Sequence, residues 1–208
     1  MRLIITGILL SLLGACGADH TPATETAAER FVALESAGMS ARDRAPEGCV
    51  QDVHTGLIWE LKSDDTGLHD WRNTYSWYDP DEAQDDFDHR GTPDGGACSG
   101  SGCDTHDLVM VANEEGVCGF TDWRIPLRDE LFSISDLARA DNPPTVDTRF
   151  FPLTQEGEYW TSNDYSFQPG SAWAWHFKFG HDRVDWKKTP KFVRLVRGSA
   201  SGLTAVKE

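Results

Sequence analysis

The chain has 208 residues, and its 34 Asp and Glu residues against 19 Lys and Arg residues give a formal net charge of −15 at pH 7. Phosphate backbones repel such an acidic protein, so we exclude generic nucleic-acid binding. Residues 48–198, about 150 in number, suffice for one hydrophobic core, so we expect a single domain there, followed by a tail at 199–208.

An apolar run with a cysteine at its end opens the chain. The run Leu3–Leu13 follows one positive charge, and Leu13-Gly14-Ala15-Cys16 closes it with small residues. We interpret residues 1–15 as a secretory signal peptide ending in a lipobox, and Cys16 as a lipidated residue that anchors the mature chain in a membrane. The run is too short for a transmembrane helix, and the alternative is a signal peptide that is cut elsewhere. By resemblance to bacterial lipoproteins, Gly17 implies export to the outer membrane.

Residues 16–47 have the composition of a tether. They are rich in Ala, Thr, Glu and Pro and poor in large apolar side chains. A capping-box pattern at Thr26-Ala27-Ala28-Glu29 and a stop at Gly38 predict one short helix within this tether. That helix is suited to docking on the domain or to packing between subunits.

Four cysteines follow the lipobox cysteine. An even number in an exported chain indicates two disulfides, for which three pairings exist. We favour Cys98 with Cys103, because the residues between them are small and flexible, and this leaves Cys49 with Cys118. A zinc site is the competing interpretation, although His106 is the only histidine near the local cysteine pair.

The first half of the domain begins with a turn and a strand that contains Trp59, which we place in the core. Trp71, Tyr75, Trp77 and Tyr78 then form an aromatic-rich stretch that either floors a sugar site or packs beneath a loop.

The long acidic segment Asp79–Gly102 follows this aromatic stretch. Within this segment, the stretch from Asp86 resembles the start of an EF-hand loop, but Arg90 and Ala97 stand where calcium ligands are needed. An EF-hand is therefore excluded, and an irregular calcium site is the remaining metal hypothesis.

Two helices are predicted in the middle of the domain. Residues 105–115 have apolar side chains at helical spacing and stop at Gly116. Asp122-Trp123-Arg124-Ile125-Pro126 reads as a short extended segment, and residues 127–137 continue as a helix with an apolar stripe. Arg124, if buried, needs a carboxylate, and Glu130 or Asp122 supplies it. The structural core is completed by three tryptophans, Trp123, Trp160 and Trp173.

The C-terminal part predicts antiparallel strands. Residues 159–162 read as a strand, alternation from Ala172 to Phe179 predicts a second, and Gly180 turns the chain into a returning strand at 184–186. A last strand at 192–196 completes an α+β domain with an antiparallel sheet, two main helices and long loops.

Several motifs together resemble the Lcl C-terminal domain family. They are Thr55-Gly56-Leu57-Ile58-Trp59, Asp122-Trp123-Arg124-Ile125-Pro126, Tyr159-Trp160-Thr161-Ser162 and Val193-Arg194-Leu195-Val196-Arg197-Gly198. The resemblance implies an extracytoplasmic module related to the C-type-lectin and formylglycine-generating-enzyme folds. The namesake is a bacterial collagen-like adhesin that binds sulfated glycosaminoglycans, whereas this chain is acidic and has no collagen repeat. Fold alone does not transfer that activity.

We therefore expect a lipid-anchored envelope domain that binds a glycan or another surface ligand without catalysis. The alternatives are a structural or protein-interaction lipoprotein and, more remotely, a hydrolase with paired carboxylates. The charge is lopsided, since residues 60–115 are acidic and residues 176–208 basic, which suits an anionic ligand, a homo-oligomer or ordinary solvated surface.

We place the ligand site on the 163–170 loop and the basic C-terminal hairpin. The expected contacts are Asn163, Asp164, Tyr165, Gln168, Lys178, Arg183, Lys187 and Lys188. For an anionic ligand, reversing Lys187 and Lys188 to Glu should abolish binding and leave the melting temperature nearly unchanged.

Overall fold

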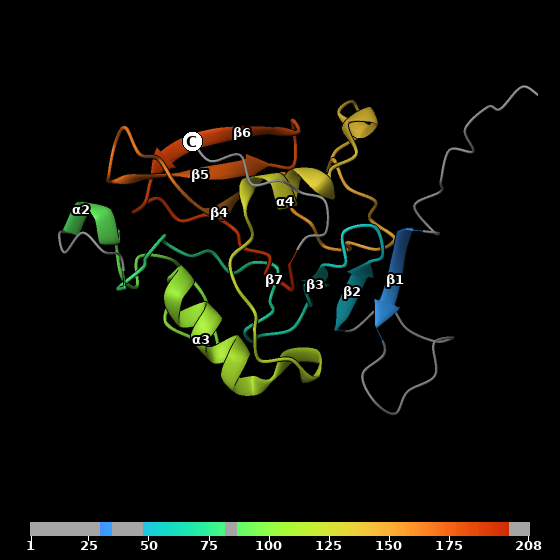
Figure 1. Cartoon of the computed structure of the whole chain (residues 1–208), viewed down its shortest axis with the longest axis horizontal. Coiled ribbons are helices and arrows are strands. Elements are labelled where there is room, and N and C mark those ends of the chain that lie inside the picture. The colour runs from blue at the N-terminus through green and yellow to red at the C-terminus, as the bar shows by residue number, and fades with distance from the viewer. Residues whose placement is uncertain (1–29, 35–47, 82–86, 200–208) are drawn as a thin grey trace, which may run out of the picture.

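The computed structural model describes residues 30–34, 48–81 and 87–199. The predicted signal peptide, Cys16, most of the tether and most of the tail lie outside these residues. Within the described part, no helix combines the length and the apolar character that crossing a membrane requires. The described chain forms an α+β domain with two antiparallel sheets (Figure 1).

The first sheet has four strands in the order β1-β2-β3-β7. They are β1 (Phe31–Leu34), β2 (Cys49–Asp52), β3 (Ile58–Glu60) and β7 (Val196–Arg197). Gly56 closes the turn between β2 and β3 with a φ of 77°, which favours glycine. The predicted last strand at 192–196 corresponds to β7, which is shorter and lies at Val196–Arg197. Val196 pairs with Trp59 of β3 and with Arg124.

Strand β1 corrects the expected helix in the tether. Residues Phe31–Leu34 pair with β2 in antiparallel register, and the Phe31 ring is buried 5.0 Å from the Phe151 ring, centroid to centroid. Strand pairing and burial of Phe31 outweigh the local helix propensity of this segment. The fold thus gains a strand ahead of the predicted boundary at Gly48, while the rest of the predicted helix lies outside the described residues.

The second sheet is the predicted C-terminal meander. Its strands are β4 (Glu158–Asp164), β5 (Ser171–His176) and β6 (His181–Trp186), in the order β4-β5-β6. The β4–β5 loop and the end of β6 lie at the end of the molecule that carries α2 (Phe87–Arg90), whereas β1 lies at the opposite end (Figure 1).

Helix α3 (Thr105–Glu115) has the predicted bounds. Asp104 accepts a hydrogen bond from the Asp107 amide at its start, and Gly116 ends it with a φ of 67°. The second predicted helix is shorter than expected: α4 covers Arg128–Ser133, and the 3₁₀ turn η2 (Leu137–Arg139) follows. Another 3₁₀ turn, η1 (Val117–Gly119), comes directly after α3.

The Asp122–Pro126 segment joins α3 to the sheets. Trp123 is buried, and Glu130 of α4 holds Arg124 through two hydrogen bonds of 2.6 and 2.7 Å. Asp122 instead pairs with Arg197. Trp59 and Trp160 are also fully buried, as expected, whereas Trp173 is only half-buried and does not belong to the core.

Both expected disulfides are present. Cys49 of β2 is joined to Cys118 of η1 across 69 residues, and Cys98 is joined to Cys103 across five. The long bridge fixes the first sheet to the end of α3, and the short bridge closes a surface loop.

Candidate functional site

Four aromatic side chains gather on the surface where β4, β5 and β6 reach the α2 end of the molecule. We call this surface the aromatic platform, and its members are Tyr165, Phe167, Trp173 and Trp186. Phe167 is 86% exposed and Trp186 is 50% exposed, while Tyr165 and Trp173 are half-buried. Large apolar side chains in such numbers at one surface mark a binding site more often than chance exposure.

The strand register brings these rings together. Trp186 pairs with Ser171 and Val184 pairs with Trp173, so Trp173 and Trp186 point to the same face of the sheet. The loop adds two rings, because the Tyr165 centroid lies 5.5 Å from Trp173 and 5.6 Å from Phe167. Tyr165 therefore contacts both Phe167 and Trp173, and Trp186 is the diagonal neighbour of Trp173 across the β5–β6 pair, although the chain separates these residues by up to 21 positions.

The inner border of the platform is polar. The Arg128 guanidinium lies 4.9 Å from the Trp173 ring centroid and 3.5 Å from Asp182. The backbone amide of Arg128 donates to the Asn163 side chain at 2.8 Å. Asn163 therefore orients α4 against the platform, and its carbonyl oxygen is already engaged.

Most of the predicted basic contacts do not form a positive surface. Lys187 is 1% exposed and its ammonium group lies 2.6 Å from Asp164, so its burial contradicts the expected ligand contact of Lys187, whereas the Asp164 side chain is partly exposed. Arg183 pairs with Glu158 at 2.9 Å, and Lys178 lies 3.5 Å from Glu156. Intramolecular carboxylates thus neutralise most of the hairpin's positive charge.

Of the eight predicted contacts, Tyr165 is the one that belongs to the aromatic platform itself. Gln168 is half-buried in the β4–β5 turn, where its backbone amide donates to the Tyr165 carbonyl at 2.9 Å. Lys188 is exposed, and its ammonium group lies 6.0 Å from the Trp186 ring centroid. The prediction missed Phe167 and Trp186 and assigned Trp173 to the core. The sequence did carry a signal for Trp186. The tight turn at Gly180 sets the register between β5 and β6, and this register places Trp186 on the same sheet face as Trp173.

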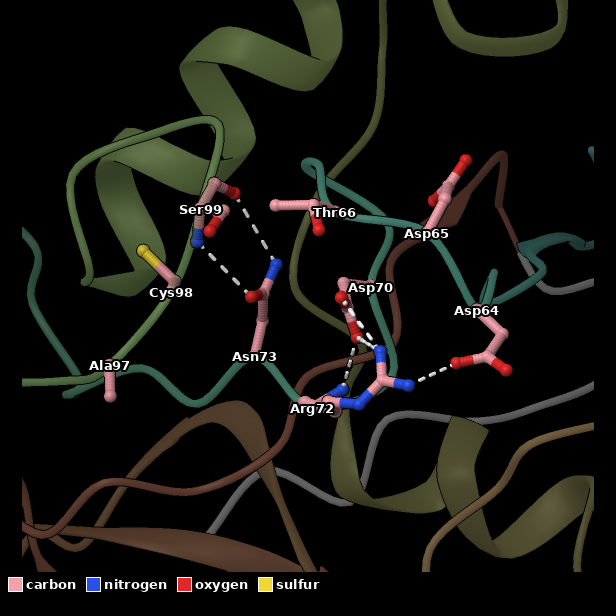
Figure 2. A pocket seen from close by; sticks show the side chains of 9 residues that line it. All are labelled: Asp64, Asp65, Thr66, Asp70, Arg72, Asn73, Ala97, Cys98 and Ser99. Atoms are coloured by element: carbon pink, nitrogen blue, oxygen red, sulfur yellow. Dashed lines mark hydrogen bonds and ion pairs between the residues drawn. The ribbon is translucent and has the colours of Figure 1, made fainter.

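A second surface feature is a polar hollow of about 570 Å³ between two loops (Figure 2). Its lining residues are Asp64, Asp65, Thr66, Asp70, Arg72, Asn73, Ala97, Cys98 and Ser99. The guanidinium of Arg72 lies between Asp70 and Asp64, and it also stacks 4.5 Å from the Trp71 ring centroid. Hydrogen bonds from Trp71 and Arg72 hold the pKa of Asp64 below its usual range.

The two rims of the polar hollow are held together by Asn73. Its side chain is buried, donates to the Gly67 carbonyl at 2.8 Å and accepts from the Ser99 amide at 3.1 Å (Figure 2). Of the four aromatic residues in that stretch, Tyr75 and Trp77 are buried and pack beneath the loops, whereas Trp71 and Tyr78 are half-buried, so packing is established for two of the four.

The acidic 79–102 segment uses several of its carboxylates internally. Asp79 accepts from the Asp81 amide at 3.0 Å and Asp94 from the Cys103 amide at 2.8 Å. Just after the segment, Asp104 accepts from the Asp94 amide at 2.8 Å and caps α3. Among residues 30–34, 48–81 and 87–199, no three His, Cys, Asp or Glu side chains are grouped to hold a metal ion. The irregular calcium site stays a prediction.

Comparison with known proteins gave one family match. A family model described as the Lcl C-terminal domain matches residues 48–197, which is most of the chain. A search of curated proteins found no match.

Proposed function

The chain belongs to the Lcl C-terminal domain family, and we propose that it is a lipid-anchored, adhesin-like domain of the cell envelope that binds a glycan on the aromatic platform. The proposed anchor is acylated Cys16 in the outer membrane. The proposed role is binding without catalysis.

The observation that carries this proposal is the exposure of the platform rings on a rigid base. Phe167 and Trp186 present large apolar faces to solvent, and Trp173 is fixed by the β5–β6 register. Aromatic faces stack on the apolar faces of sugar rings, and polar groups at the border supply hydrogen bonds to hydroxyl groups. Here Arg128, Asp182 and Gln168 stand at that border or in the adjacent turn.

The position of the aromatic platform also supports an adhesin-like role. The platform lies at the α2 end of the molecule, and β1, the first described strand after Cys16 in the sequence, lies at the other end (Figure 1). A chain anchored through Cys16 would therefore hold its platform away from its point of attachment.

The shifted pKa values of the carboxyl groups point to ion pairs and hydrogen bonds and not to a general acid. A glycosidase that works near neutral pH needs a general acid whose pKa is raised. In the described part of the chain, every carboxyl group with a shifted pKa has it lowered, because hydrogen bonds and nearby cations outweigh burial. These groups are Asp52, Glu60, Asp64, Asp122, Asp147 and Asp185.

A printed saccharide array probed with the purified mature chain, with and without a chelator, tests the proposal. Trp186→Ala and Phe167→Ala should each lose binding, whereas Phe132→Ala, which removes another half-exposed ring on α4, should retain it. Equal binding by all three variants would refute the platform as the site. Loss of binding with chelator would place calcium in the interaction.

Two further outcomes separate the parts of the proposal. An empty array, together with a captured envelope protein whose binding needs Trp186, would favour the protein-interaction alternative. The intact mass of the mature protein tests the anchor, and an N-terminus at Cys16 without acyl chains would exclude it.

A further inference from the structure

A buried lysine lies directly beneath the aromatic platform. Lys187 follows β6 and is 1% exposed, with its ammonium group 2.6 Å from the Asp164 carboxylate and 4.0 Å from the Trp77 ring centroid. The same ammonium donates to the His89 carbonyl oxygen of α2. A buried ammonium is costly to desolvate, and three partners from three separate segments offset that cost.

Lys187 contacts both ends of the platform loop. Asp164, the ion-pair partner of its ammonium, is the last residue of β4 and directly precedes Tyr165. The backbone amide of Lys187 donates to the Gly170 carbonyl at 2.9 Å, at the point where the loop returns to β5. One residue therefore fixes the start and the finish of the segment that carries Tyr165 and Phe167.

The lysine also ties the loop to the rest of the domain. Its carbonyl accepts from the Trp77 amide at 2.8 Å, and the Trp77 indole donates to the Thr161 carbonyl of β4 at 2.9 Å. Gly91 leaves room for this arrangement, since a Cβ atom there would lie 2.3 Å from the Trp77 carbonyl oxygen and 3.2 Å from Lys187 Cδ. Trp186, a platform ring, is the immediate chain neighbour of the lysine.

We propose that Lys187 is the positioning residue of the aromatic platform, holding the 165–170 loop in its binding conformation from below without touching the ligand. This inference rests on the proposed function, because it takes the platform as the binding surface. It assigns to the most buried lysine of the hairpin a role in loop geometry in place of the direct ligand contact expected from the sequence.

The experiment compares Lys187→Met with Lys191→Met in the full mature chain. Lys191 is a matched control, because it is 4% exposed, pairs with Asp185 at 2.6 Å and lies 5.0 Å from the Trp160 ring centroid, yet contacts no residue of the 165–170 loop in the described structure. Hydrogen exchange of the Tyr165, Gln168 and Ser171 amides, which close the loop, is the readout. We expect about tenfold faster exchange in Lys187→Met and little change in Lys191→Met.

Asp164→Asn provides a second, milder variant, because Asp164 is partly exposed and its loss leaves the contacts of Lys187 to Trp77 and His89 in place. It should also accelerate exchange of the loop amides and weaken binding to the saccharide array. Lys187→Arg, which keeps the charge, should restore part of both.

Equal loop exchange in the Lys187→Met and Lys191→Met variants would overturn the positioning role, whatever the array shows. So would array binding by Lys187→Met at the wild-type level. Failure of the proposed function has a different signature, in which Phe167→Ala and Trp186→Ala bind the array like the wild type.

Discussion

The aromatic platform stands on strands β5 and β6 and the loop before β5, whereas the polar hollow lies between two loops, and the buried charges that support the two regions differ in sign. The platform exposes apolar rings, and its loop rests on a buried cation, Lys187. The hollow exposes carboxylates such as Asp65, and a buried carboxylate, Glu60, supports its rim by contacts with Lys62 and His69 at 2.8 and 2.7 Å. In both regions a buried group carries the sign of charge that predominates in its own stretch of sequence.

This difference shows that the charge of a segment does not locate charge on the surface. The basic hairpin places Lys187 and Lys191 inside, where Asp164, Asp185 and Glu158 neutralise them. A lysine-rich stretch therefore supplies structural ion pairs here, and the surface that remains for a ligand is mainly aromatic. The predictions below test the contrast between the two regions.

The largest effect on stability is expected from a charge reversal beneath the platform. Lys187→Glu places a second carboxylate beside Asp164 in a buried site, which should lower the free energy of unfolding by about 3–5 kcal/mol. Chemical denaturation measures this change. Lys188→Glu is the control, because Lys188 is exposed and its reversal should change stability by no more than about 0.5 kcal/mol. Similar losses in both variants would mean that burial of Lys187 is not what distinguishes them.

The second effect concerns the buried carboxylate beneath the hollow. Burial alone would raise the pKa of Glu60, but the charge of Lys62 and the hydrogen bond with His69 outweigh it and lower the pKa to about 2 from 4.5. A lowered folded-state pKa stabilises the protein above pH 4.5, and this contribution, about 3 kcal/mol, is lost as the pH falls from 4.5 towards 2.

Urea denaturation at pH 7 and pH 3 measures the loss, and Glu60→Gln is the control. Other carboxyl groups with lowered pKa values, such as Asp52 and Asp185, titrate in both proteins. The wild type should therefore lose more stability on acidification than Glu60→Gln does. Identical pH profiles would show that Glu60 contributes nothing at neutral pH.

A third, smaller effect on stability is expected from the disulfide at the edge of the polar hollow. The Cys98–Cys103 disulfide borders the hollow, and replacing both cysteines by Ser should lower the free energy of unfolding by about 2 kcal/mol, because the closed loop is short. Binding to the saccharide array should stay unchanged, since the platform rests on other segments. A joint loss of stability and array binding would show that the two regions are coupled.

Local signals predicted the features whose partners lie close in the chain. The α3 bounds follow from apolar spacing and a stop at Gly116, and the pairing of Arg124 with Glu130 spans six residues. The short disulfide follows from the flexible residues between its cysteines. The family resemblance, carried by motifs across the whole domain, is confirmed by the family match.

The failed predictions depend on partners that are distant in the chain. β1 is a strand because β2 offers it an edge, and no local pattern encodes that pairing. Lys187 is buried because the His89 carbonyl, 98 residues away, and Trp77 form its cage. Exposure of Trp186 depends likewise on how far α4 extends over its sheet face, where the described contacts of α4 reach Trp173, Trp175 and Asp182.

The smallest expected effect is the same charge reversal made in the hollow. Asp65→Lys changes the charge by two units, as Lys187→Glu does, but Asp65 is exposed and its carboxylate accepts only a hydroxyl hydrogen bond, from Ser63, among the contacts described for it. The free energy of unfolding should change by no more than about 0.5 kcal/mol. At low ionic strength the change should be towards higher stability, because the new cation lies beside Asp64 in an acidic surface, and added salt should screen it. Denaturation in 0.01 and 1 M salt measures both points. A loss as large as that of Lys187→Glu would show that the hollow is as closed as the base of the platform, and the contrast between the two regions would fail.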